Sequence, residues 1–106
     1  MGYNRTMIET IKYNNKTIKI PKPFNQCEFG ENPLEEISVA NPFNGESVLL
    51  PRFAVAIYDT IKGSEQIASR TDQLHGDGTS PLWSTVRKGL DWFQKYFTKQ
   101  YYVLLD

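Results

Sequence analysis

The sequence has one cysteine, one histidine and no long apolar run, and each scarcity excludes a class of protein. A single cysteine, Cys27, cannot form an intramolecular disulfide, which fits a reducing cytoplasm better than a secreted scaffold. The longest apolar run, Phe53 to Tyr58, is far too short to cross a bilayer, and the first residues lack the apolar segment of a signal peptide. We therefore expect a cytoplasmic protein with no membrane association.

Net charge is also lacking, because twelve basic residues balance twelve acidic ones. Without an overall positive field, general nucleic-acid binding is disfavoured. The charges are nevertheless unevenly placed: residues 1–27 carry a balance of +4 and residues 28–50 a balance of −5. This asymmetry indicates either that the two segments attract each other in the fold or that an acidic patch is offered to a basic partner.

The length and the hydrophobic content of the chain are sufficient for one folded domain. The chain has 106 residues, of which 40% are hydrophobic and 13% aromatic. This length suits a single domain spanning residues 1–106, with a core that needs neither a metal ion nor a disulfide.

Two hairpins are predicted in the first half of the chain. β-Branched residues alternate with polar ones around Asn14-Asn15, a pair that tolerates the positive φ of a tight turn and sets Ile11 opposite Ile18. After a Pro- and Gly-rich connection at 21–35, the apolar runs 37–40 and 47–50 flank the turn cluster 41–46.

Two helices are predicted in the second half. Proline at the first helical position costs no hydrogen bond, so Pro51 and Ser80-Pro81 mark helix starts, with a polar loop expected at 69–80. Hairpin, hairpin, helix, helix indicates an α+β fold, in which two β-hairpins form a small antiparallel sheet and two helices pack on one face. Residues 101–105 are apolar enough to dock as a strand or a helical turn.

Helical periodicity predicts which side chains face the core. In the first helix the buried stripe is Phe53, Ile57, Ile61, Ser64 and Ala68. In the second helix the stripe is Leu82, Val86, Leu90, Phe93 and Phe97. Gly89 falls beside that stripe, where its missing side chain permits a close approach of another element.

Candidate catalytic and ligand-binding groups are few. The cluster Asp72, His75 and Asp77 resembles a metal or acid–base site, but it falls in the expected loop and lacks further ligands, so we interpret it as solvated. Cys27 has no adjacent base, and Glu35 and Glu36 are neighbours that point apart. Neither catalytic residues nor a metal or other cofactor are therefore predicted.

The most informative feature lies off the core side of the second helix. Trp92 and Tyr96 project outside the central stripe and are bordered by Lys88, Lys95 and Lys99. Half of the fourteen aromatic residues lie between Trp83 and Tyr102, more than one helix face can bury. The pair is therefore either the flank of a wide core or an exposed partner-binding anchor of the kind enriched at interface hot spots.

Several segments resemble a known group of proteins. Residues 41–48, 50–51, 54–59 and 87–93 are similar to stretches of small uncharacterised proteins encoded by tailed bacteriophages, and the likeness covers 41–63 and 80–106. The resemblance implies an accessory protein that acts in the host cytoplasm during infection, commonly by binding a host protein.

These observations favour a non-enzymatic protein-binding module, an inhibitor or modulator of a host protein, with Trp92, Tyr96, Lys88, Lys95 and Lys99 as its contact surface. The alternative is a homo-oligomer that binds a small anion such as a nucleotide, through Arg87, Lys88 and residues 76–80. An enzymatic interpretation rests on His75 with Asp72 or Asp77 and is the weakest of the three.

Overall fold

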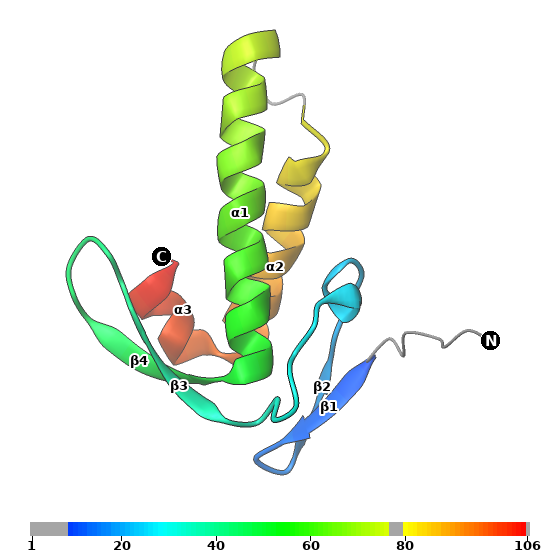
Figure 1. Cartoon of the computed structure of the whole chain (residues 1–106), viewed down its shortest axis with the longest axis vertical. Coiled ribbons are helices and arrows are strands. Elements are labelled where there is room, and N and C mark those ends of the chain that lie inside the picture. The colour runs from blue at the N-terminus through cyan, green and yellow to red at the C-terminus, as the bar shows by residue number, and fades with distance from the viewer. Residues whose placement is uncertain (1–8, 77–79, 106) are drawn as a thin grey trace.

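A computed structural model describes residues 9–76 and 80–105 of the chain (Figure 1). The elements are β1 (Thr10–Tyr13), β2 (Lys16–Lys19), a 3-10 turn η1 (Phe24–Gln26), β3 (Glu36–Ala40), β4 (Ser47–Pro51), α1 (Arg52–His75), α2 (Leu82–Tyr96) and α3 (Thr98–Leu104). The α+β class is confirmed. The two hairpins form separate two-stranded sheets instead of one joint sheet. They lie on opposite sides of the lower half of α1 in Figure 1.

The first hairpin has the predicted register. Ile11 pairs with Ile18 and Tyr13 with Lys16, around a turn in which Asn14 and Asn15 have φ angles of 49° and 63°. Two positive φ values in succession match the right-handed twist of the strands, which is why asparagine occupies both positions. The alternation places Ile18 in the core and leaves Lys19 exposed.

The second hairpin is also confirmed, with Val39 opposite Val48 and Ile37 opposite Leu50. Its turn closes on Gly45, whose φ of 78° favours glycine. Phe43 stands out at this turn because 91% of its surface is exposed.

Helix α1 begins one residue after Pro51 and is longer than expected. The predicted loop over 69–80 is wrong for its first part, because the helix continues to His75 and ends at Gly76, which has a φ of 109°. Trp83 explains the extension: its indole Nε1 donates a 2.7 Å hydrogen bond to Asp72 Oδ2, so α2 holds the last turns of α1. The predicted buried stripe is confirmed at Phe53, Ile57, Ile61 and Ala68, while Ser64 is half-buried.

Helix α2 starts at Leu82, whose backbone N–H donates to the Ser80 hydroxyl at 3.2 Å. Its buried face is rotated from the predicted one: Val86, Gly89, Trp92 and Phe93 are buried, whereas Leu82 and Leu90 are only partly so. Gly89 causes this rotation. A Cβ there would overlap the Ile61 side chain and lie 3.1 Å from Phe24 Cζ, so the helices cross where the side chain is missing.

Aromatic rings form the centre of the core. Phe53 is fully buried and makes edge or tilted contacts, with centroids 5.9 to 6.3 Å apart, to Tyr13, Phe29, Trp92 and Phe97. The C-terminal residues are helical rather than extended, and Leu104 of α3 is buried. These contacts join both hairpins to the three helices in one cluster.

A hydrogen bond joins the predicted basic and acidic segments: the Tyr13 hydroxyl donates to Glu36 at 2.8 Å. Tyr13 is uncharged, so this bond does not test the predicted attraction between the two segments, which stays a prediction. Arg52 forms an ion pair with Glu35, and Lys62 with Glu65; neither of these two pairs involves residues 9–27. Within 9–76 and 80–105, no helix has the length and apolarity to span a membrane.

Candidate functional site

Trp92 is a core residue with one edge near the surface. It is 5% exposed, and its Nε1 donates a 2.7 Å hydrogen bond to the Lys19 carbonyl oxygen of β2. An indole N–H that leaves water needs such a partner, and the partner here comes from the first hairpin. Of the two alternatives from the sequence, the flank of the core is the correct one for Trp92; it is not an exposed anchor.

The exposed edge of Trp92 nevertheless contributes to a hollow of about 360 Å³, here named the tryptophan hollow. Its wall combines the end of the first hairpin with the outer face of α2, and its members are Lys19, Pro21, Lys88, Asp91, Trp92, Lys95 and Tyr96. The aromatic rings and the proline supply an apolar floor, while three lysines and one aspartate supply the rim. Four of the five residues predicted for partner binding meet here; Lys99 does not.

Tyr96 forms one wall of the tryptophan hollow and is held from two sides. Its hydroxyl oxygen accepts a long 3.4 Å hydrogen bond from the backbone N–H of Lys19. The Lys95 Nζ lies 5.1 Å from the centre of its ring, within the range of a cation–π contact. The ring of Trp92 lies beside it, with centroids 5.7 Å apart. Tyr96 is thus half-buried and held by these three contacts.

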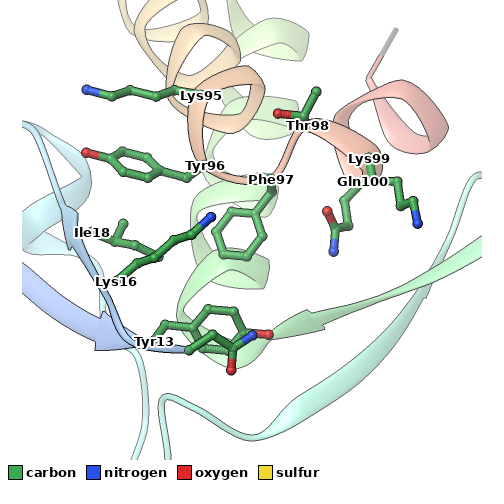
Figure 2. A pocket seen from close by; sticks show the side chains of 10 residues that line it. Tyr13, Lys16, Ile18, Lys95, Tyr96, Phe97, Thr98, Lys99 and Gln100 are labelled. Carbon is green, nitrogen blue, oxygen red and sulfur yellow. The ribbon is translucent and has the colours of Figure 1, made fainter.

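A second hollow, of about 320 Å³, also has Tyr96 in its lining (Figure 2). Three lysines from three elements line it, Lys16 of β2, Lys95 of α2 and Lys99 just inside α3, and we name it the lysine hollow. In Figure 2 the Phe97 ring points into it toward Tyr13. No carboxylate is among its lining residues in the described part of the chain.

Tyr13, which lines the lysine hollow, has a raised pKa. Burial and the neighbouring Glu36 carboxylate raise the pKa of Tyr13 to about 12, because both disfavour a phenolate anion. Tyr13 therefore stays neutral at physiological pH, and its hydroxyl donates a hydrogen bond to Glu36.

The candidate catalytic groups do not come together. Cys27 Sγ lies 3.4 Å from Thr60 Oγ1 in the middle of α1, whereas His75 ends that helix, about 22 Å further along at 1.5 Å per residue. Asp72 Oδ2 accepts a hydrogen bond from the Trp83 indole, and Asp77 lies outside the described residues. Glu35 and Glu36 do point apart, toward Arg52 and Tyr13 respectively. No cluster of three or more potential metal ligands forms within 9–76 and 80–105.

The alternative anion site is likewise not assembled in one place. Lys88 lines the tryptophan hollow, whereas Arg87 lines a different depression beside Glu65 and Trp83. Ser80 is buried at the start of α2, and residues 77–79 of the predicted loop are not described.

Three basic or apolar residues that line the tryptophan and lysine hollows were not predicted from the sequence. Lys16, Lys19 and Pro21 line the two hollows only because the first hairpin packs against α2, a contact across more than 70 residues of chain for which no local signal exists.

Comparison of the chain with protein families, with curated proteins and with solved structures found no match.

Proposed function

We propose that the protein is a non-enzymatic protein-binding module that captures an acidic segment of a partner through the tryptophan hollow. One observation carries the proposal: Lys19, Lys88 and Lys95 surround an apolar floor made by Trp92 and Tyr96. A carboxylate-rich segment with one aromatic or long aliphatic side chain satisfies both parts of this surface. The apolar side chain covers the floor, and the carboxylates approach the lysines.

The likeness to accessory proteins of tailed bacteriophages adds a partner class to this proposal. On that basis the partner is a host protein, and the module inhibits or modulates it. The rim charges govern the rate of encounter and the choice of partner more than the final affinity, because exposed ion pairs are worth only about 0–1 kcal/mol each. The apolar contact supplies the larger share, and most of it is with half-buried Tyr96, because Trp92 offers only an edge.

A fluorescence titration tests the proposal directly. Trp83→Phe leaves Trp92 as the only tryptophan, at the floor of the hollow. A short peptide of aspartate and glutamate with one central phenylalanine is expected to change its emission in a saturable way. The same peptide with alanine at the centre, or with lysines in place of the acids, is expected to leave the emission unchanged.

Charge-reversed variants provide the matched control. Lys88→Glu with Lys95→Glu should abolish the response, whereas Lys62→Glu with Arg70→Glu on α1 changes the net charge equally and lines neither hollow, so it should respond like the parent. Equal responses of the two variants, or no response from the parent, would contradict the proposal. Binding should also weaken as salt rises from 0.01 M toward roughly 0.15 M, where the Debye length falls to about 8 Å.

The lysine hollow favours a second candidate function, the binding of a small anion. Lys16, Lys95 and Lys99 line it from three elements, whereas Arg87 and Lys88 line two different depressions. A thermal-shift screen against inorganic phosphate and nucleotides tests it, since a ligand at one hundred times its dissociation constant adds about 2.7 kcal/mol. Stabilisation that Lys16→Ala removes would support this function, and no shift across the panel would exclude it.

A further inference from the structure

The turn between β3 and β4 displays an aromatic side chain on a braced backbone. Phe43 is 91% exposed, yet its own N–H donates to Asn41 Oδ1 at 2.7 Å, and the Asn41 N–H and carbonyl bond to Glu46 and Gly45 at 2.7 and 2.9 Å. The Asn41 side-chain amide also donates to the Val103 carbonyl oxygen of α3 at 2.7 Å. The turn is therefore anchored both within itself and to a helix.

This bracing separates Phe43 from ordinary exposed apolar residues. Single exposed hydrophobic side chains are common and need no explanation. A phenyl ring on a fixed turn, however, has little backbone freedom left to lose when it is bound, which makes it an efficient anchor. Glu46 on the same turn is exposed and adds a negative charge to it.

The tryptophan hollow has the complementary properties. Its volume of about 360 Å³ exceeds that of a phenyl ring, its floor is aromatic, and three lysines outweigh Asp91 on its rim. The turn belongs to residues 28–50, the segment with a charge balance of −5. Size, polarity and charge thus match between Phe43 with Glu46 and the hollow.

The two parts do not meet within one molecule. The β3–β4 turn and the β1–β2 hairpin lie on opposite sides of α1 (Figure 1), and Phe43 is almost fully exposed to solvent. Phe43 can therefore reach the tryptophan hollow only from a second copy of the chain.

We propose that the protein associates with itself head to tail, with Phe43 of one copy inserted into the tryptophan hollow of the next and Glu46 beside the rim lysines. The inference rests on the proposed function, because it names an occupant for the same hollow. The contact is heterologous, so it extends to further copies unless a ring closes. One turn in one hollow buries less than the roughly 1,200 to 2,000 Å² of stable interfaces, which sets the association in the weak, concentration-dependent range.

Sedimentation velocity over about two decades of concentration, from roughly 10 μM to 1 mM, tests the inference because this range brackets weak association. The sedimentation coefficient of the parent chain is expected to rise with concentration. Phe43→Ala should sediment as a monomer throughout, as should Lys88→Glu with Lys95→Glu. Leu74→Ala removes a different exposed apolar side chain, one at the far end of α1, and should behave like the parent.

Mixing the two defective variants provides the decisive measurement. The Phe43→Ala chain keeps an intact hollow and the charge-reversed chain keeps an intact turn, so the mixture should form dimers and nothing larger. A parent that stays monomeric at every concentration, Phe43→Ala that still associates, or a mixture without dimers would overturn the inference. The peptide titration does not depend on any of these results, so a chain that does not associate with itself is distinguishable from a failure of the proposed function.

Discussion

The indole Nε1 of Trp92 donates a 2.7 Å hydrogen bond to the carbonyl oxygen of Lys19, a residue 73 positions earlier in the chain. This bond joins the first hairpin to α2 at the base of the tryptophan hollow. The hollow therefore exists only while the hairpin is docked, and its shape depends on a buried polar contact as well as on apolar packing.

Trp92→Phe is expected to destabilise the protein. The variant keeps a ring in the core but leaves the Lys19 carbonyl oxygen without its partner, which costs about 1–3 kcal/mol. Tyr96→Phe is the matched control, because its hydroxyl makes only the 3.4 Å contact to the same residue and its loss should cost less than about 1 kcal/mol. Urea denaturation of both variants checks that Trp92→Phe loses more unfolding free energy than Tyr96→Phe, and equal losses would contradict this expectation.

Gly89→Ala is expected to destabilise the protein even though alanine is the better helix former. The propensity gain is about 1 kcal/mol, but the added methyl group meets Ile61 and Phe24, which are 1% and 0% exposed and have no room to move. We expect a net loss of about 1–2 kcal/mol, as for other overpacked cores.

Gly63→Ala on α1 is the control for this substitution. Nothing lies within 4 Å of a Cβ at that position, so only the propensity gain of up to about 1 kcal/mol applies. If Gly89→Ala lowers the temperature of thermal unfolding and Gly63→Ala raises it, the close crossing of α1 and α2 at Gly89 is established. Stabilisation by both alanines would refute it.

Asp72 serves to fasten the end of α1 to α2. Asp72→Ala removes the acceptor of the Trp83 indole and should cost about 1–2 kcal/mol, whereas Asp72→Asn keeps an acceptor oxygen and should lose less. His75→Ala, at an exposed position three residues on, should change the unfolding free energy by less than about 0.5 kcal/mol. An alanine variant at Asp72 as stable as the parent would return this residue to the role of a solvated side chain.

Alkaline pH should weaken the fold through Tyr13. The pKa of Tyr13 is raised to about 12 from an ordinary value of 10.0, so the unfolded chain releases this proton first. The contribution of Tyr13 is complete below pH 10 and is lost as pH rises from 10 toward 12. The difference in unfolding free energy between the parent and Tyr13→Phe should therefore shrink over that interval, measured by urea denaturation at a series of pH values. A difference that is constant with pH would contradict the raised pKa.

The elements with local causes were predictable from the sequence. Asn14-Asn15 fixes the first hairpin because both residues adopt positive φ, and the alternation around them fixes its register. Ser80 and Pro81 locate the start of α2 to within one residue in the same way. Each of these depends on neighbours in the chain, which a sequence displays directly.

The remaining features depend on distant partners. Periodicity centred the predicted face of α2 near Val86, with Leu90 on it and Gly89 beside it. The predicted close approach at Gly89 is confirmed, but no local pattern shows that Ile61 and Phe24 are the residues that meet it. Residues 69–75 are polar and indicated a loop, but Trp83 stabilises them as helix. The basic rim of the hollows combines lysines from both ends of the chain, and only the packing of the first hairpin on α2 brings them together.

Asn41 uses its backbone N–H, its carbonyl, its side-chain oxygen and its side-chain amide, the last on Val103, only three residues before the final residue of the sequence. The C-terminal helix and the Phe43 turn are thus joined through Asn41 and Val103, which lie 62 positions apart in the sequence. Trimming the chain after Tyr102 would remove the acceptor of this bond and with it one anchor of a turn far upstream.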